Sequence, residues 1–358
     1  YVDGADGKQG GVGILRTDAA GGELCLVLKY SAHGMGHGHF DKLSYSLYDE
    51  IGEAVQDYGA ARWVNIDQKG GGIYLPENQT WAKQSIAHNT LVMNERTHFE
   101  GDIKKGEAHH PDLYFFQADK PGRQAVSAKD RHAYPGSELH RTMVLWNDPG
   151  FEKPLVLDVF RVRSDSVSQY DLPLWFQGHL MTQNFDYQPE TTSLSTLGTG
   201  HGYQHLWKEA VGKTDQGHAQ FTWFGNGHFY TQTCVVAPED ELIFARLGAN
   251  DPKFNLRHDP VFIQRKKGVK TAVFFSIIER HGAYNPVEEI PETPFPKVAR
   301  VRLVHESQQY TVAGFQHTNG DQWTLLLANE DASETSAHEV RAGGNLFRWT
   351  GPVYVMKN

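Results

Sequence analysis

Alternation of apolar and polar residues recurs along almost the whole chain, and the three-to-four residue periodicity of amphipathic helices is nearly absent. Leu43, Tyr45 and Leu47, for example, alternate with Ser44, Ser46 and Tyr48, which places one face of a strand in a core. Further strand-like segments, rich in Val, Leu, Phe, Tyr and Thr, are 24–29, 90–94, 113–118, 155–163, 220–224, 228–236, 269–278, 298–305 and 323–328. Many strands without intervening helices predict an all-β fold, an antiparallel multi-sheet β-sandwich.

Residues 285–297 interrupt this pattern with four prolines and three glutamates. Strand-like residues resume at 298 and continue to the end of the sequence. We therefore predict an antiparallel sandwich over residues 1–297 and a smaller C-terminal sheet over residues 298–358 that closes it. A long loop within a single sandwich is the alternative.

Charge and hydropathy narrow the choice of partners. The formal net charge of −9 argues against a broad surface for nucleic acid or anionic lipid, although a cleft can still be locally positive. No apolar run reaches the roughly 18 residues that a membrane span needs. The first residues have neither a basic nor an apolar export region, so an export signal is expected on a segment that precedes them.

The segment from 29 to 41 is the least ordinary part of the sequence, because three histidines alternate there with glycines. His37 and His39 are two residues apart and share one face of an extended chain, about 6.5 Å apart along it. Together with the later Asp57 and His88, His39 forms a plausible zinc set of two imidazoles and one carboxylate, with water as the fourth ligand. The alternative is a polar, hydrogen-bonded surface loop.

A second β-sandwich family, the cupins, also uses a His-x-His pair. A cupin needs a glutamate four or five residues after the second histidine. Those positions are Leu43 and Ser44 in this chain, so the cupin interpretation lacks its third ligand.

Three consecutive glycines at 70–72 precede Tyr74 and predict a mobile or tightly turned loop that carries an aromatic hydroxyl. Arg62 lies shortly before it, and a guanidinium is well suited to bind a carboxylate in a two-pronged manner. Each also has an ordinary structural interpretation, Tyr74 as a half-buried anchor and Arg62 as part of a surface ion pair.

These segments together closely resemble the oligoalginate lyases of polysaccharide lyase family 17, within the wider group of heparinase II/III-like lyases. The matching sequence motifs are HGMGHGHFDKL at 33–43, DYGAAR at 57–62, YLPEN at 74–78 and AKQSIAHNTLV at 82–92. The resemblance implies an N-terminal (α/α) toroid followed by an antiparallel β-sandwich, with the active site between them. This chain matches the sandwich part, so the toroid is expected on a separate segment or chain.

The resemblance also implies roles for individual residues. Tyr74 matches the family's catalytic tyrosine, expected to be the general acid, and His37 and Arg62 match active-site residues near the substrate. The zinc of the family is structural, and the residues that match its ligands are His39, Asp57 and His88. The toroid's own catalytic tyrosine and its Asn-His pair have no counterpart here, so this chain alone is expected to have little or no activity.

The expected reaction is β-elimination on alginate oligosaccharides, by family habit exolytic and releasing unsaturated monouronate. Charge that develops on the uronate carboxylate must be stabilised, and the leaving oxygen needs a proton. An ordinary phenol, with a pKa of about 10, keeps its proton at neutral pH and can supply it.

Two other functions stay open. One is a non-catalytic carbohydrate-binding sandwich, and the other is a lyase that acts on heparin, heparan or a related glycosaminoglycan. The family implies a periplasmic or secreted enzyme, and a homodimer is one expected assembly.

Overall fold

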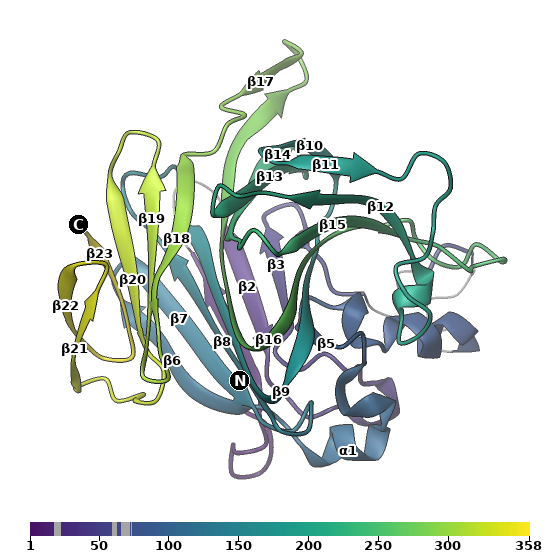
Figure 1. Cartoon of the computed structure of the whole chain (residues 1–358), viewed down its shortest axis with the longest axis horizontal. Helices are drawn as coiled ribbons and strands as arrows, with labels where there is room; N and C mark the ends of the chain where they lie inside the picture. Colours follow the sequence, from purple (N-terminus) through teal and green to yellow (C-terminus); the bar gives the residue numbers. More distant parts are fainter. Residues whose placement is uncertain (18–22, 59–62, 66–71, 73) are drawn as a thin grey trace.

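The computed structural model of the chain describes residues 1–17, 23–58, 63–65, 72 and 74–358. Three layers of antiparallel sheet make up most of it (Figure 1). In this view the C-terminal sheet lies at one side of the molecule, and α1 with most of the short helical turns lies at the other.

The first layer is a four-stranded sheet in the order β1-β2-β3-β4. Its strands are β1 (Val12–Arg16), β2 (Leu24–Lys29), β3 (Tyr45–Asp49) and β4 (Glu53–Val55). In β2 every second side chain is buried, as the alternating sequence requires of a sheet with one covered face.

The middle layer is a 13-stranded sheet in which β9 and β16 are the longest strands. Its strands are β5 (Val92–Met93), β6 (Asp112–Lys120), β7 (Arg123–Asp130), β8 (Ser137–Trp146), β9 (Leu155–Trp175), β10 (His179–Gln183), β11 (Asp186–Pro189), β12 (Leu206–Lys213), β13 (His218–Gly225), β14 (His228–Val235), β15 (Glu241–Leu247), β16 (Pro260–Asn285) and β17 (Ile290–Glu292). The β9–β16 pairing runs along both strands and is interrupted by register shifts between Lys266 and Thr271. Such irregularities bend a strand, which lets β9 and β16 serve two differently oriented parts of one sheet.

The third layer is a four-stranded sheet in the order β18-β19-β20-β23, with a separate two-stranded hairpin. The strands are β18 (Val298–Glu306), β19 (Tyr310–His317), β20 (Gln322–Ala328) and β23 (Val353–Lys357), and the hairpin consists of β21 (Ala337–Ala342) and β22 (Asn345–Thr350). The hairpin packs on the outer face of this sheet through Phe347 and Trp349.

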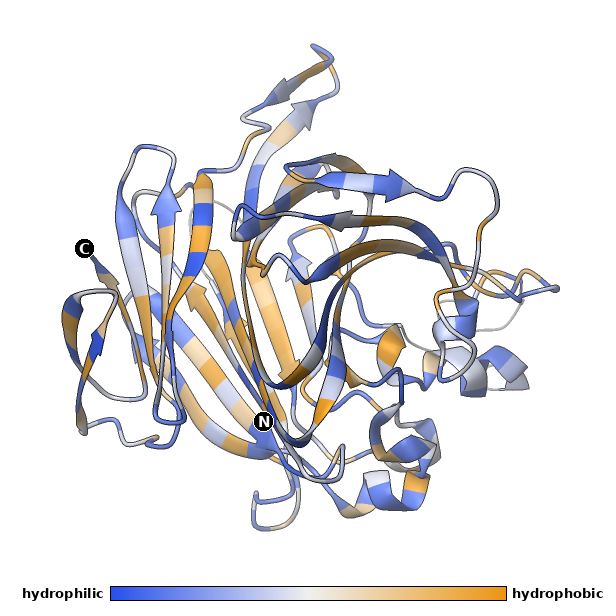
Figure 2. Ribbon diagram, in the orientation of Figure 1, coloured by the Kyte–Doolittle hydropathy of each residue, from blue (hydrophilic) through white to orange (hydrophobic). Residues whose placement is uncertain are grey.

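The middle sheet is buried on both faces, and this explains its apolar runs. In β8, Met143 belongs to the core shared with the first layer, whereas Val144 belongs to the core shared with the third. Colouring by hydropathy shows apolar stretches along these central strands (Figure 2). The predicted antiparallel multi-sheet β fold is therefore confirmed.

The proline-rich segment 285–297 is a β-hairpin arm in part, because β17 pairs with the end of β16. A new sheet begins at Val298, but its core is shared with strands that precede residue 297. The division into domains at 297 and 298 stays a prediction.

Helical structure is short and lies mostly on the side that carries the histidine–glycine segment. Among the described residues it includes α1 (Ile103–Ala108), a π-helical stretch Asn78–Ala82, and 3-10 turns at Met35–His37, Ser85–Ala87, His98–Gly101 and Tyr203–His205. Within the part of the chain that the structure describes, no helix is long and apolar enough to span a membrane.

Candidate active site and metal-ligand cluster

The histidine–glycine segment reaches β3 through a tight, hydrogen-bonded loop. A Cβ at Gly38 would lie 1.6 Å from the carbonyl oxygen of His33, so this close approach requires glycine. Lys83 Nζ donates to the carbonyl oxygen of Gly36 at 2.8 Å, and the Phe40 N–H donates to that of Lys83 at 3.0 Å. The buried lysine thus joins this loop to the segment that leads to His88.

Four potential metal ligands meet beside this loop. His39, Asp41, Asp57 and His88 each offer a ligand atom, and all four atoms lie within 4.8 Å of one another. The rings of His39 and His88 have centroids 4.9 Å apart, and His88 Nδ1 makes a short contact with Asp57 Oδ1. The structure therefore brings together the three residues predicted as a zinc set and adds Asp41.

A buried amide holds the three contributing segments in register. Asn89, next to His88, donates from Nδ2 to the carbonyl oxygens of Tyr45 at 2.9 Å and Gln56 at 2.6 Å. Its Oδ1 accepts the Trp175 N–H at 2.8 Å. Asn89 thereby fixes Gln56, which precedes Asp57, and Tyr45, which begins β3, to the middle sheet at Trp175.

Charges in the cluster compensate one another. Burial opposes ionisation of Asp41, but Lys29, whose Nζ lies 2.6 Å from Asp41 Oδ2, and the two imidazoles outweigh it and lower the pKa of the carboxyl. Burial likewise opposes protonation of His88, yet the Asp57 carboxylate outweighs it and raises the pKa of the imidazole. Burial and the neighbouring His88 lower the pKa of His39 to about 4.

The predicted catalytic residues lie at the surface or outside the described part. His37 ends the 3-10 turn Met35–His37 and is exposed. Tyr74 is 84% exposed, and its hydroxyl makes no hydrogen bond with another described residue. Arg62 lies outside the described residues. Within the described part of the chain, neither His37 nor Tyr74 makes a hydrogen bond, ion pair or ring contact with the four ligands. Their roles stay predictions.

The comparisons with known proteins decide the family. The profile described as "Heparinase II/III-like, C-terminal" matches residues 2–290, which is most of the chain. The chain belongs to this heparinase II/III-like family. The predicted resemblance is confirmed at this level.

Two curated relatives show which members of the family this heparinase II/III-like chain is similar to in sequence. It is 42% identical over 349 residues to an "Alginate lyase" from Stenotrophomonas maltophilia, an alignment that covers 98% of this chain and 46% of the relative. It is 40% identical over 352 residues to an "Exo-oligoalginate lyase" from Saccharophagus degradans, with 98% of this chain and 47% of the relative covered. The chain thus spans about half the length of the curated relatives it matches.

A solved structure supports the same fold. A heparan sulfate lyase from Pedobacter heparinus superimposes with a TM-score of 0.60 at 13% identity, covering 93% of this chain and 43% of that one. At this identity the likeness concerns the fold, which agrees with the layered sheets described above.

The donor set of this heparinase II/III-like chain fits a divalent cation such as zinc. Two imidazoles and two carboxylates are ligands that zinc accepts, and Asp41 Oδ1 is buried without a hydrogen-bond partner among the described residues. His88 Nε2 lies 3.0 Å from the carbonyl oxygen of Ala82, which can only accept, so Nε2 carries the hydrogen and Nδ1 faces the cluster. An orphaned carboxylate oxygen and an oriented imidazole are what a metal site requires.

Sequence reasoning missed Asp41 and Lys29. Asp41 stands two residues after His39, the same spacing that relates His39 to His37, so alternation along an extended chain is the sequence signal that identifies it. Lys29 ends β2 and reaches Asp41 only because β2 and β3 are paired. A cavity of about 140 Å³ beside these two residues is also lined by Ser44, Tyr45 and Asp57.

Proposed function

We propose that this chain is the β-sheet half of a lyase that cleaves alginate oligosaccharides by β-elimination, acts from a chain end and releases unsaturated monouronate. The observation that carries this proposal is 40–42% identity over 98% of the chain to two curated proteins named as alginate-degrading lyases. The exposed Tyr74 and His37 support it, because both side chains are free to meet a ligand.

In this reaction a base removes the proton at C5, α to the uronate carboxylate, and the C4–O glycosidic bond breaks as the C4=C5 double bond forms. Negative charge grows on the carboxylate, and positive groups or hydrogen-bond donors aimed there stabilise it. We assign this role to His37 and Arg62. The departing glycosidic oxygen takes a proton, which we assign to the hydroxyl of Tyr74.

The base and the remaining carboxylate contacts are assigned to the part of the protein outside this chain, the expected (α/α) toroid. This agrees with the half-length coverage of the relatives. A positioned acid or base contributes roughly 10²–10⁴-fold to the rate, so the chain alone is expected to turn over poorly or not at all.

Zinc, held by His39, Asp57 and His88 beside Asp41, would supply a structural cross-link between three segments and no chemistry on the substrate. His39 lies two residues after His37, so ordering of the cluster also positions His37.

The test is ultraviolet absorbance of the unsaturated uronate, with alginate oligosaccharides as substrate and with this chain measured with and without its N-terminal partner segment. A rise only when the segment is present supports an active site shared between two domains. A rise from this chain alone would place the base within these 358 residues. No rise in either sample, or a rise only with heparan or hyaluronan, would overturn the proposed substrate.

A further inference from the structure

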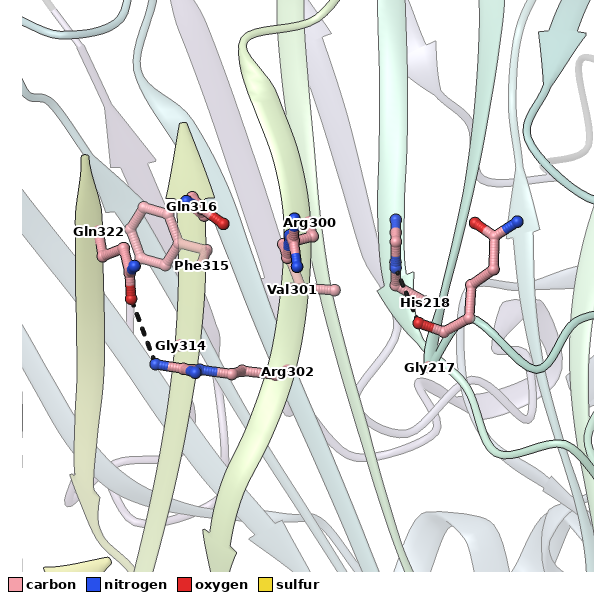
Figure 3. A pocket seen from close by; sticks show the side chains of 10 residues that line it. Gly217, His218, Arg300, Val301, Arg302, Gly314, Phe315, Gln316 and Gln322 are labelled. Carbon is pink, nitrogen blue, oxygen red and sulfur yellow. Dashed lines mark hydrogen bonds between the residues drawn. The ribbon is translucent and has the colours of Figure 1, made fainter. Parts of the chain in front are cut away.

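A groove of about 340 Å³ lies between the C-terminal sheet and the turn that precedes β13 (Figure 3). Its volume falls within the range of small-molecule sites, about 300–1,000 Å³. The residues that line it with polar side chains are Gln216, His218, Arg300, Arg302, Gln316 and Gln322. None of them belongs to the site described above.

The lining is cationic in a chain whose formal net charge is −9. It holds two guanidinium groups, an imidazole and three carboxamides, and no carboxylate. Arg300 is exposed and forms no hydrogen bond or ion pair with any residue that the structure describes. Asp321, adjacent to Gln322, is already bound by Lys357 at 2.8 Å. The groove therefore offers positive charge that the protein itself leaves uncompensated.

Arg302 is positioned by a glycine in the middle of a strand. Its side chain runs across β19 at Gly314 toward Gln322, where its Nη2 lies 3.4 Å from Gln322 Oε1 (Figure 3). A Cβ at Gly314 would lie 2.9 Å from Arg302 Nε. Glycine inside a strand weakens it and often marks a close approach, so Gly314 makes room for this cation on the floor of the groove.

Buried contacts hold the two walls together. The Glu279 carboxylate of β16 accepts the N–H groups of Lys297 and Val298 at 2.8 Å, where β18 begins. Gln220 of β13 donates from Nε2 to the carbonyl oxygen of Val298 at 2.9 Å. Both bonds tie β18 to the middle sheet, so the arginines of one wall and His218 of the other keep their separation.

We propose that this groove is a second binding site, for an acidic oligosaccharide, and that Arg300 and Arg302 bind its carboxylates while the three glutamines bind its hydroxyls. Guanidinium pairs well with carboxylate, and carboxamides both donate to and accept from hydroxyl groups. The choice of a uronate as the acidic sugar rests on the proposed function. The groove binds sugar residues of the oligosaccharide that are not at the bond being cleaved.

The experiment is titration calorimetry of the full-length protein carrying Tyr74→Phe, which keeps the probe intact, with a saturated guluronate pentasaccharide at low salt. Two binding events per chain are expected. The double change Arg300→Gln and Arg302→Gln should weaken the affinity of one of these events about tenfold or more, because it removes both guanidinium–carboxylate pairs. A tenfold loss corresponds to about 1.4 kcal/mol. The matched control is Arg341→Gln, an exposed arginine of β21 that does not line the groove.

A local readout accompanies the titration. The pentasaccharide should slow amide hydrogen exchange in residues 298–317 of the parent and not of the double variant. An unchanged titration in the double variant, an equal loss with Arg341→Gln, or a single binding event in the parent that the double variant keeps would each overturn the site. Equal binding of inorganic phosphate would assign a general anion patch and overturn its carbohydrate character.

The two proposals fail separately. Lyase activity is measured by ultraviolet absorbance on protein that retains Tyr74, with a trisaccharide substrate, and the arginine double variant should turn it over at the parental rate. An active lyase without the second binding event contradicts only the groove. Binding in the groove without unsaturated product contradicts only the lyase.

Discussion

The region around the histidine–glycine loop and the C-terminal sheet are built in opposite ways. Among described residues 29–101, five that are not glycine have a positive φ: Leu43, Asn94, Glu95, Phe99 and Glu100. In residues 298–358, all of which the structure describes, only glycines do. A positive φ in a residue other than glycine costs conformational energy, and the surrounding structure must hold it in place. Leu43 follows Asp41 by two residues, whereas Asn94 and Glu95 bond Ser168 and Arg265 of the middle sheet.

The two regions also differ in what fills their interiors. Around the histidine–glycine loop, buried charged groups form ion pairs and bond the backbone: Arg141 pairs with Asp158 and donates to the carbonyl oxygen of Leu43, and Asp41 pairs with Lys29. Beneath the C-terminal sheet, Phe315 and Trp323 stack with ring centroids 5.6 Å apart in an apolar core. The comparison indicates that the regular, apolar C-terminal sheet contributes stability, whereas the irregular, ionic region around the histidine–glycine loop positions functional groups.

The largest expected effect separates chemistry from stability. Tyr74→Phe should lower kcat of the full-length lyase about 10²–10⁴-fold, because it removes the proton given to the leaving oxygen. The thermal unfolding midpoint should not change, since this side chain is 84% exposed. The control is Tyr354→Phe, a tyrosine of the C-terminal sheet with 43% exposure, which should leave both quantities unchanged. Equal turnover by the Tyr74 variant would remove it from the mechanism.

The next effect tests the ionic interior. Arg141 bonds Asp158 and donates to the carbonyl oxygens of Leu43 and Asn89. Arg141→Leu should lower the free energy of unfolding by about 3–5 kcal/mol, because it leaves a buried carboxylate unpaired. It should also lower kcat, since the segments that carry His39 and His88 each lose a bond to the middle sheet.

Trp323→Ala in the C-terminal sheet is the matched change for Arg141→Leu. Loss of this buried indole should cost a similar 3–5 kcal/mol or so, measured by denaturant unfolding, while kcat at a temperature well below the transition is retained. If both variants lost turnover equally, the contrast between the two regions would not hold.

A smaller effect concerns the metal. Lys29→Met should weaken zinc binding about 10–100-fold, because Lys29 holds the Asp41 carboxylate in the cluster. Competition with a chromophoric chelator measures the affinity. Lys357→Met, which removes the exposed Lys357–Asp321 pair, should leave it unchanged. Turnover that vanishes at once on chelation and returns with zinc, without refolding, would contradict a structural role for the ion.

The smallest effect is a pH dependence at the junction of the middle and C-terminal sheets. Burial raises the pKa of Glu279 to about 7, against the opposing N–H groups of Lys297 and Val298. The folded state therefore holds this proton more tightly than the unfolded chain, whose glutamates titrate near 4.5. Stability contributed by this group is full below about 4.5 and is lost as the pH rises through about 7, by about 1 kcal/mol between pH 6 and 7.

Glu279→Gln should remove that slope from unfolding curves measured at pH 6 and pH 7. Glu339→Gln, at an exposed site of β21, should keep it. A slope that persists without Glu279 would have to come from another group.

Local patterns predicted much of the fold. The expected strand 24–29 is β2, and 228–236 differs from β14 by one residue. The expected strand 269–278 is only part of β16, which runs from Pro260 to Asn285. The polar stretch around Gly268 looks like a turn in the sequence, although the pairing with β9 continues on both sides of it. Length and layering depend on partners about a hundred residues away, which no local window contains.

The candidate site divides in the same way. His39, Asp57 and His88 were predicted together and do meet. Arg141 could not have been singled out, because its backbone partners lie 98 and 52 residues away in sequence. The groove at Arg300 could not be predicted either, since its walls, β18 and the start of β13, lie about 80 residues apart in sequence and meet only in the folded chain, for example through the Gln220–Val298 bond.

The long pairing of β9 with β16 has a consequence for how the chain is made. β9 ends at Trp175, and the partner that covers it begins at Pro260, so a ribosome must add about a hundred further residues before this ladder can close. Contacts so distant in sequence form slowly, and an apolar strand without its partner is prone to aggregate. We therefore expect the yield of folded protein to depend on how fast the ribosome synthesises residues 175–285 and on whether chaperones bind the unpaired β9 during that time. Substitutions at the surface should matter less.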